Sequence, residues 1–349
     1  VHSKILHIGI KTGPDIACIS TGNFHEGNAR TYTDCILMTA AERITKDVSA
    51  VFDFIERPYT QARFKELLVS PNRMRNKFEQ LIQNEILNKK AGKPAYIKVK
   101  VNHITDLKMV SKLYEAAQCG VEVDLLVRGN CSLMPEKAGL SDHMKVCGII
   151  DRYLEHARIF IFANGGNELV YMGSADWMTR NLDNRIEVVT PVYDARIKEE
   201  LKLIVDYGLA DTSQGRLVDG SGENLPWKGL LETDLEPKRF RSQEALYAHY
   251  AAEMAGSEAP GALSEDAGTG TVSELPVSGT RGRKATASKS RQSGSSALVS
   301  TEKAPKQGTR TRTGKSTKAV QAQPEEEAKP DKGLVSGKVA RSRPRNTKS

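Results

Sequence analysis

One pattern of chemically useful residues occurs twice in this chain, about 150 residues apart. Each copy begins with a histidine, has a cation two residues later, continues with a small polar turn and ends with a carboxylate. The polar residue of the turn follows the histidine by 21 residues in one copy and 20 in the other, and the acid comes 11 residues later in both. The repeat predicts one active site that is shared by two related halves. The residues of the pattern are His2, Lys4, Thr21, Asn23 and Asp34, then His156, Arg158, Ser174, Asp176 and Glu187.

These residue types suit the transfer of a phosphoryl group. A neutral imidazole can attack phosphorus and hold the group covalently, while a second imidazole protonates or stabilises the leaving oxygen. Lys4 and Arg158 point to the same side as their histidines because side-chain direction in a strand repeats every second residue, so each can neutralise phosphate oxygens. Asp34 and Glu187 can each fix the tautomer of a histidine, either within one copy or across the two. Hydrogen-bonding roles at the turns are expected for Asn23, Asp176, Thr21 and Ser174.

A single copy of the pattern indicates little, because a lone His-x-Lys more often contains a structural or surface histidine. The agreement of two copies at three linked positions favours catalysis. Trp177 and Phe24 occupy equivalent places, and we expect both to pack as core residues beneath the turns. The remaining histidines have no matched counterpart, so we interpret them as structural or surface residues: His7, His25, His103, His143 and His249.

The charge of the chain is unevenly distributed. Residues 251–349 contain 18 Lys and Arg against 10 Asp and Glu, which accounts for the whole net charge of +8 and leaves a neutral body. Residues beyond Tyr250 include no aromatic side chain, and this composition predicts a disordered basic tail without secondary structure. The tail is either a solubilising extension or a tether for polyanions.

The cysteines and the hydropathy of the chain suggest a cytosolic protein. Five cysteines without C-x-x-C spacing argue against a disulfide framework and a zinc site. No apolar run approaches the roughly 20 residues that a bilayer-spanning helix needs. We therefore predict a cytoplasmic protein without a transmembrane segment, and association with the membrane surface stays open.

The periodicity of apolar residues predicts an α/β body. The alternation of strand and helix from residue 96, with a crossover of more than a dozen residues, implies a parallel pair of strands. Expected strands are 5–10, 16–20, 35–38, 96–101, 121–127, 159–162, 169–172 and 186–192. Expected helices are 41–55, a helix that starts with Pro71 and runs through Ile86, 106–119 and 194–207. The apolar stripe expected on the helix 41–55 consists of Ile44, Val48, Val51, Phe52 and Ile55.

Several other cations and one tyrosine are candidates for contacts with anions. Arg128 ends a predicted strand where α/β folds bind ligands, with a surface ion pair as the alternative. Tyr32 is either a strand residue that is half-buried or a ring that stacks on a base. A predicted first helical turn contains Arg73, Arg75 and Lys77, which line a phosphate path or form a solvated face. Arg180 and Arg185, which follow the second turn, are better candidates for such a path.

The spacing is similar to the pattern of the phospholipase D superfamily, in which His-x-Lys is followed by Gly-Ser-x-Asn and an acid. The surrounding residues resemble the C-terminal catalytic half of the bacterial polyphosphate kinases, in order and with few gaps over residues 1 to about 250. The segments that carry this resemblance are 2–4, 20–24, 29–34, 126–129, 151–156 and 174–181, the last of which reads Ser-Ala-Asp-Trp-Met-Thr-Arg-Asn.

The resemblance implies an ATP–polyphosphate phosphotransferase that works reversibly. It assigns His2 as the histidine that the terminal phosphate of ATP phosphorylates, and His156 as the partner histidine that contacts the nucleotide. Tyr32 and Arg128 match further ATP-contacting positions. Magnesium is the implied cofactor, ATP or ADP and inorganic polyphosphate are the implied substrates, and a homo-oligomer is implied for the full-length protein.

The resemblance also implies missing parts. In the family, other domains precede the nucleophilic histidine and contain the metal-binding residues, so we expect no metal ligands in this chain and a truncated fragment with little or no activity alone. We expect residues 1–65 to be the C-terminal part of one phospholipase D-like α/β domain, residues 66–250 a second such domain that faces it, and residues 251–349 the tail.

Two other functions remain open. A phosphodiesterase of the wider superfamily would use the same histidines, although Arg158 and Asp176 stand where that pattern has Lys and Asn. A non-enzymatic scaffold would bind polyanions through the tail.

Overall fold

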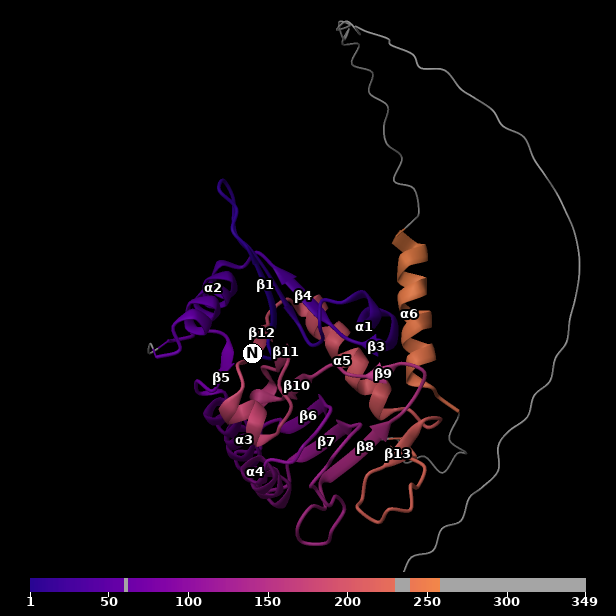
Figure 1. The fold of residues 1–349 in the computed structure, drawn as a ribbon. Helices are drawn as coiled ribbons and strands as arrows, with labels where there is room; N and C mark the ends of the chain where they lie inside the picture. The colour runs from indigo at the N-terminus through magenta and orange to yellow at the C-terminus, as the bar shows by residue number, and fades with distance from the viewer. Residues whose placement is uncertain (60–61, 230–238, 258–349) are drawn as a thin grey trace, which may run out of the picture. The chain divides into compact units, whose positions relative to one another are not determined.

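The first 39 residues form a small sheet that contains the first copy of the motif (Figure 1). The computed structural model describes residues 1–59, 62–229 and 239–257. Strands β1 (Lys4–Ile8), β2 (Ile16–Ser20) and β4 (Ile36–Thr39) pair antiparallel in the order β1-β2-β4. These strands confirm the three that the sequence predicts, with ends shifted by one or two residues.

Helix α2 (Glu42–Glu56) packs on this small sheet. Ile44, Val48 and Val51 are buried against Ala17 and Ile19 of β2, as the helical spacing predicts. The prediction for Phe52 is wrong, because its side chain is 39% exposed and Phe54 is buried in its place. The loop after the helix provides the reason, since Phe64 packs edge-on against Phe54 at 6.2 Å.

The second copy of the motif lies in an eight-stranded mixed sheet, with the order β13-β8-β7-β6-β10-β11-β12-β5. Its centre is parallel, as predicted, and all its other pairings are antiparallel. Strands that the sequence analysis finds are β6 (Tyr96–Val101), β7 (Glu122–Val127), β10 (Ile159–Phe162), β11 (Leu169–Gly173) and β12 (Glu187–Val192). Strands that it misses are β5 (Leu68–Ser70), β8 (Met144–Ile149) and β13 (Gly215–Leu217).

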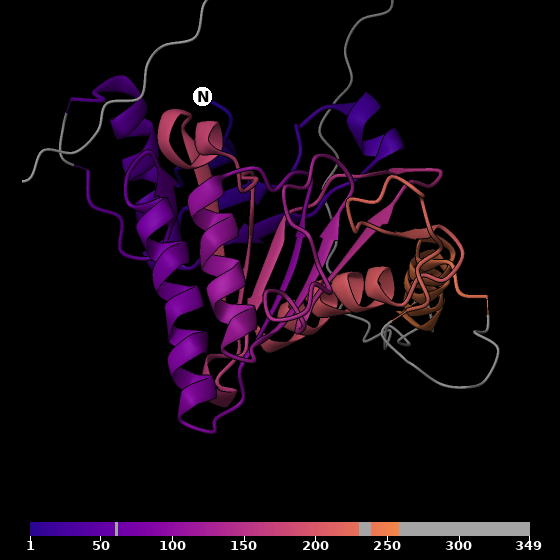
Figure 2. The ribbon, with the colours of Figure 1, turned by 90° about the horizontal axis from the view of Figure 1, so that it is seen from below.

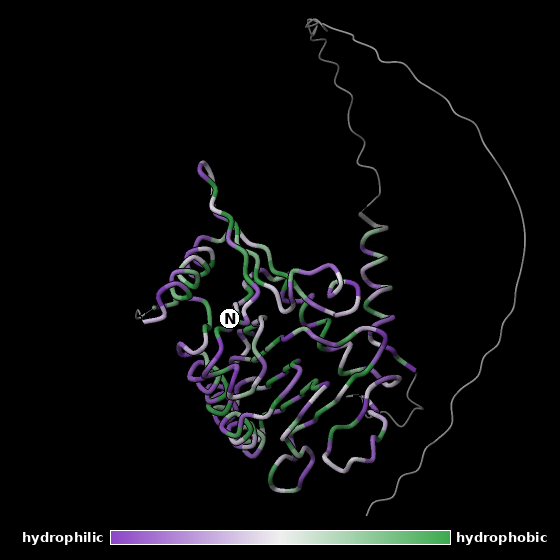
Figure 3. Tube along the Cα trace, viewed as in Figure 1, coloured by the Kyte–Doolittle hydropathy of each residue, from purple (hydrophilic) through white to green (hydrophobic). Residues whose placement is uncertain are grey.

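Helices cover both faces of the large sheet (Figure 2). On one face, α3 (Met74–Lys90) and α4 (Leu107–Gln118) lie side by side and enclose the largest apolar cluster. On the other face, α5 (Ala195–Leu209) buries Leu201, Val205 and Leu209. Hydrophobic stretches along the strands of both sheets are visible in Figure 3. A strand buried on two sides needs apolar residues on both, which explains the continuous apolar run of β10.

Helix α3 begins later than the sequence suggests. Ser70 still belongs to β5, Pro71–Arg73 form the connection, and the helix starts at Met74 rather than at the proline. Pairing of β5 with β12 causes the difference, because it extends the strand through Ser70 and delays the helix. Local preference for proline at the first helical position is overridden by this long-range pairing.

The boundary of the tail also needs a correction. Helix α6 (Ser242–Ser257) continues past Tyr250, into the part for which no secondary structure is predicted. The segment Ala251–Met254 consists of strong helix formers, so it extends a helix that has already started. Residues 258–349 lie outside the described part, and the predicted disorder of the tail remains a prediction. Among the described residues, no helix is both long and apolar enough to cross a bilayer.

Candidate active site

The two copies of the motif occupy equivalent strands of the two sheets. In the first, His2 precedes β1, Thr21 follows β2 and Asp34 precedes β4. In the second, His156 precedes β10, Ser174 follows β11 and Glu187 begins β12. The strands β1-β2-β4 and β10-β11-β12 are both antiparallel meanders with the same order. The duplication seen in the sequence is therefore a duplication of structure.

Each acid contacts the histidine of the other copy. Nδ1 of His2 lies 2.8 Å from Oε2 of Glu187, and Nδ1 of His156 lies 2.8 Å from Oδ1 of Asp34. The sequence left pairing within a copy and pairing across copies open, and the structure selects the second. Since ionised carboxylates only accept hydrogen bonds, both histidines carry a proton on Nδ1. Nε2 of His2 has no hydrogen-bond partner among the described residues, whereas Nε2 of His156 accepts from Nη1 of Arg158 at 3.1 Å.

Backbone pairing between the copies places each acid beside its histidine. The carbonyl of Thr33 accepts from the N–H of Ala157, and the carbonyl of Ile186 accepts from the N–H of Ser3, both at 2.9 Å. A two-residue parallel ladder between β3 (Tyr32–Thr33) and β9 (Leu154–Glu155) supports the first of these contacts. The ladder and the two hydrogen bonds involve too few residues to produce a pattern in the sequence.

The hydroxyl groups of the turns hold the acids in place. Thr21 donates to Asp34 at 2.7 Å, and Ser174 donates to Glu187. Each hydroxyl also accepts from the backbone N–H of the residue after the acid, Cys35 or Val188. The hydrogen-bonding roles expected for Thr21 and Ser174 are thus present, and they are equivalent in the two copies.

Asn181 is a site residue that the sequence analysis missed. Its buried amide donates to Oε1 of Glu187 at 2.5 Å, so this acid is held by Asn181, Ser174 and His2 together. A signal was available, because Asn181 follows Asp176 by five residues and Asn28 follows Asn23 by the same interval. Asn28 has no corresponding side-chain bond to Asp34 among the described contacts.

Glycine is required at the first turn by the close approach of Asp34. A Cβ atom on Gly22 would lie 1.8 Å from Oδ2 of Asp34. The equivalent residue in the second copy is Ala175, which is accommodated there. The carboxylate of Asp34 therefore occupies the volume that a side chain at residue 22 would need.

Two buried cations lie between the histidine–acid pairs. Burial lowers the pKa of Lys4 to about 8, with opposing contributions from Glu187 and Asp34 that show both acids to be close. Arg158 is 3% exposed and donates to the carbonyl of Thr21 in the first copy at 3.1 Å. Arg158 therefore contacts residues of both copies, and Lys4 donates to the carbonyl of His2. Buried cations in such positions can stabilise the charge of a phosphate group.

His156 is held in its neutral form. Burial lowers its pKa, and the positive charge of Arg158, whose Nη1 is 3.1 Å from Nε2 of the imidazole, acts in the same direction. Asp34 opposes the shift without reversing it. The pKa of Asp34 is lowered in turn, because the hydrogen bonds from His156 and Thr21 outweigh the effect of burial.

The polar turn residues of the two copies are not equivalent. Asp176 is buried, and its ion pair with Arg158 keeps its pKa below the ordinary value although burial acts to raise it. It also accepts from the backbone N–H of Asn102 at 2.7 Å. Asn23, in contrast, is exposed, and no side-chain hydrogen bond of it is present in the described structure. The sequence predicts the same role for both, and only Asp176 has it here.

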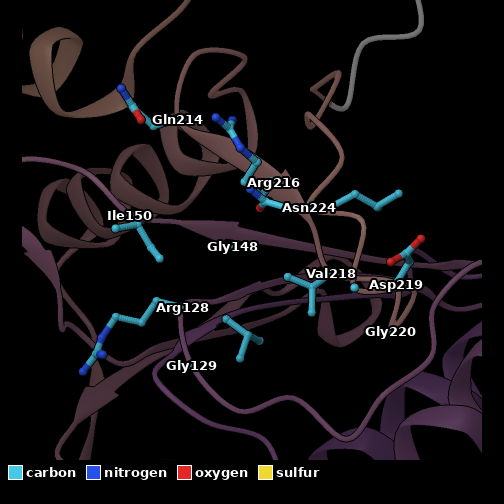
Figure 4. A pocket seen from close by; sticks show the side chains of 13 residues that line it. Arg128, Gly129, Gly148, Ile150, Gln214, Arg216, Val218, Asp219, Gly220 and Asn224 are labelled. Carbon is cyan, nitrogen blue, oxygen red and sulfur yellow. The ribbon is translucent and has the colours of Figure 1, made fainter.

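Tyr32 and Arg128 lie at the side of His156. The rings of Tyr32 and His156 are 4.9 Å apart at 54°, so the tyrosine is a neighbour of the site. Arg128 donates from Nε to the amide of Asn102 at 2.6 Å, and its positive charge contributes to lowering the pKa of His156. It also borders a hollow of about 520 Å³, and its guanidinium points away from Arg216 on the far side (Figure 4).

The other candidate cations differ in their surroundings. Arg75 is no part of a solvated face, because it forms bidentate hydrogen bonds with Asp106 at 2.6 and 2.7 Å and also pairs with Asp183. Arg185 is close enough to Lys4 to lower its pKa, and Arg180 does the same to His103. Arg73 and Lys77 are exposed.

The predictions for the core aromatics and the unmatched histidines have different outcomes. Trp177 is fully buried, with its ring 5.5 Å from that of Phe78. Phe24 is 51% exposed, so its predicted core role is wrong; the turn after β2 leads into the helix α1 (Glu26–Thr31), which buries no residue. The unmatched histidines contact local partners, as expected of structural residues: His7 with Asp15, His25 with Gly27, His103 with Asn130, His143 with Glu122 and His249 with Glu253.

The acids of the site do not suit a magnesium ion. Asp34, Asp176 and Glu187 each have a histidine or arginine partner, whereas Mg²⁺ needs free oxygen ligands in octahedral geometry. Within the described residues, the group that could hold a metal is Glu200, His249 and Glu253 on α5 and α6. That group includes an imidazole and lies on other elements, so it does not fit magnesium at this centre.

The fold and the site define a class of protein: a mixed α/β protein with a duplicated histidine–acid centre around buried cations. Comparison with known families specifies the class further. Residues 1–61 match the model of polyphosphate kinase C-terminal domain 1, and residues 67–236 match that of polyphosphate kinase C-terminal domain 2. The chain belongs to the polyphosphate kinase family and corresponds to its C-terminal half.

Individual relatives agree with this assignment. The chain is 44% identical over 252 residues to a polyphosphate kinase of Vibrio parahaemolyticus. The aligned residues cover 71% of this chain and 35% of that protein. It is 46% identical over 222 residues to a polyphosphate kinase of Escherichia coli K12, covering 63% and 32%. A crystal structure of polyphosphate kinase from Porphyromonas gingivalis superposes with a TM-score of 0.67 at 38% identity, covering 73% of this chain and 39% of that one. The matched segments thus span about a third of the relatives' length.

Proposed function

We propose that this chain contains the phosphoryl-transfer centre of an ATP–polyphosphate phosphotransferase, which works reversibly through a phosphohistidine on His2. The crossed pairing of His2 with Glu187 and of His156 with Asp34, around Lys4 and Arg158, is the observation that carries the proposal. The names of the relatives support the substrate class.

His2 acts as the nucleophile. Glu187 accepts the Nδ1 proton, so that the Nε2 lone pair attacks the terminal phosphorus of ATP. An N–P bond forms while the bond from phosphorus to the bridging oxygen breaks, and ADP leaves with that electron pair. A terminal oxygen of polyphosphate then attacks the phosphorus of the phosphohistidine, and the N–P bond breaks with its electron pair on Nε2. The polymer is one phosphate longer, and the proton returns from Glu187 to Nδ1, which leaves His2 neutral. The reverse sequence makes ATP from ADP.

The cations stabilise the charge that develops on the transferred group. Lys4 and Arg158 are buried, so their interaction with phosphate oxygens is weakly screened by water. His156, neutral because of its lowered pKa, positions the nucleotide phosphates together with Arg128, and Tyr32 forms the neighbouring wall. The roles of His156, Arg128 and Tyr32 follow the resemblance, and those of Lys4 and Arg158 are added to it.

Magnesium is the proposed cofactor of the reaction and would supply charge neutralisation on the nucleotide phosphates. Because the acids of this centre are engaged, its protein ligands are expected outside the residues described here. ATP, ADP and polyphosphate are the proposed partners, and a homo-oligomer is proposed for the full-length protein.

A labelling experiment tests the proposal. Incubation of the full-length protein with ATP that is labelled on the terminal phosphate should give acid-labile, base-stable label on the histidine that is His2 in this chain. The variant His2→Ala should lose this label, while the matched variant His7→Ala, whose histidine pairs with Asp15 on the same strand, should retain it. Label that persists in His2→Ala, or hydrolysis of a phosphodiester without ATP, would contradict the proposal.

A further inference from the structure

A hollow of about 500 Å³ lies between the loop that follows residue 61 and the start of α3. Four of its lining residues are cations with exposed side chains, and no ion pair involves any of them within the described residues. Two lie on the loop and two lie at the helix, so the charges come from two sides of the hollow. We call this feature the basic groove; its cations are Arg63, Lys65, Arg73 and Lys77.

The negative charge of the basic groove is small and already engaged. Glu66 is the one acid among its lining residues, and it accepts a hydrogen bond from the hydroxyl of Tyr193. The neighbouring Arg75 differs from the groove cations, because it forms ion pairs with both Asp106 and Asp183. Four cations face one acid on this hollow, so an excess of positive charge remains, and a bound polyanion would neutralise it.

The walls of the basic groove are fixed by hydrogen bonds. Asp47 of α2 accepts from the backbone N–H groups of Glu66 and Leu67 at 2.7 and 2.9 Å. The amide of Asn72 donates to the carbonyl of Ala62 at 2.7 Å and ties the loop to the connection before α3. A preformed groove loses less conformational entropy when it binds its ligand.

The basic groove begins close to the catalytic centre. Ser70, the last residue of β5, is paired with Glu187, the acid that holds His2. Arg73 follows only three residues later and lines the groove. An extended ligand that leaves His2 along this edge strand would therefore reach the start of α3, where Arg73 lies.

We propose that the basic groove binds the growing inorganic polyphosphate chain as a second anchoring site, outside the transfer centre. The identity of the polymer rests on the proposed function. Nucleic acid fits less well, because single-stranded binding uses exposed aromatic rings for base stacking. The one aromatic lining residue, Phe64, is half-buried and packs against Phe54.

The test compares binding of long-chain polyphosphate and of tripolyphosphate to the 349-residue chain without ATP. Arg73→Ala/Lys77→Ala should weaken binding of the long polymer about tenfold and reduce the slope of log affinity against log salt by about 1 to 2. Binding of tripolyphosphate should weaken less, because its three phosphates can contact fewer of the cations at once. The control Lys89→Ala/Lys90→Ala removes two exposed charges from the other end of α3 and should bind as the unmodified chain does.

Chemical footprinting locates the contact independently of the basic tail, which is present in every variant. Long-chain polyphosphate should protect Lys65 and Lys77 from acetylation but not Lys89 and Lys90. Equal affinity of the groove variant and the control, equal protection of all four lysines, or equally tight binding of single-stranded RNA would overturn the proposal. If the unmodified full-length protein takes up no label on His2, the proposed function is refuted. The comparison between the groove variant and the control variant is not affected by that result.

Discussion

Asp34 and His156 are 122 residues apart in the chain, yet the carboxylate lies 2.8 Å from Nδ1 of the imidazole. The same relationship links Glu187 to His2 across 185 residues. Each half of the centre thus supplies the acid for the other half, so neither half is complete alone. A perturbation on one sheet should therefore appear at the histidine of the other sheet.

The variant Asp34→Asn should affect His156. Because the carboxylate raises the pKa of this histidine against the lowering effect of burial, its loss should lower that pKa further. Phosphoryl transfer should fall by about 10²-fold or more, since the imidazole loses its fixed tautomer. NMR titration of the histidines measures the first effect and labelling of His2 the second. Asp15→Asn, which removes the partner of His7, is the control and should leave both unchanged. An unaltered His156 titration in Asp34→Asn would contradict the crossed pairing.

Lys4 should make stability depend on pH in the alkaline range. Its pKa is about 8 in the folded chain, against 10.5 when unperturbed. Between these values the unfolded chain holds a proton that the folded chain has released, so the free energy of unfolding should rise with pH. The contribution is at most about 1.4 kcal/mol per pH unit.

Urea unfolding between pH 8 and 10 measures this contribution. The rise should be smaller in Lys4→Met than in the unmodified chain, whereas substitution of exposed Lys11 by Met should not change the slope. Equal slopes in the Lys4→Met variant and the unmodified chain would show that the ammonium of Lys4 is not buried as described.

Substitution of Gly22 tests the close packing of Asp34. A methyl group there would lie 1.8 Å from the carboxylate, so Gly22→Ala should displace Asp34, destabilise the chain by roughly 1–3 kcal/mol and uncouple His156. Gly9→Ala is a matched control, because its nearest neighbour is 3.9 Å away. Thermal unfolding and the His156 titration report the two effects. If both variants behave alike, Asp34 is not confined by the turn.

Asn181 is expected to position Glu187. Asn181→Ala removes a hydrogen bond to a charged, buried group and should cost about 1.5–3 kcal/mol, with slower formation of phosphohistidine on His2. The control is Asn184→Ala, which makes the same substitution at an exposed asparagine three residues later. The labelling rate at saturating ATP separates this role from a purely structural one, and a rate equal to that of Asn184→Ala would exclude it.

Neighbouring arginines at the start of α3 should differ in their effect on stability. Arg75→Ala leaves buried Asp106 without its bidentate partner and should cost about 3–5 kcal/mol. Arg73→Ala, two residues earlier and on the exposed side, should change the free energy of unfolding by less than about 0.5 kcal/mol. Chemical denaturation measures the free energy of unfolding of both variants. A large decrease in Arg73→Ala would mean that the basic groove is needed for folding.

Local patterns in the sequence predicted most of the elements. Alternation and helical spacing identified β6, β7 and α4 within a few residues, because burial on one face imposes a period that can be read directly. The strands β10 and β12 are buried at every residue, so they were found from their runs of apolar residues and not from a period. They failed where pairing with a distant strand decides the conformation, as at β5, whose three residues are held by β12. The boundary near residue 65 between two phospholipase D-like domains stays a prediction.

The spacing of the motif also predicted which residue types form the site, but not how they pair. Sequence alone determined the two histidines, the two cations and the two acids, because their types and intervals repeat. Only the tertiary structure decided that each acid serves the opposite histidine, that Asn181 joins the site and that Asn23 is exposed. The physical reason is that local periodicity specifies which face of a strand is buried, whereas hydrogen bonds between segments more than 100 residues apart depend on how two sheets pack together.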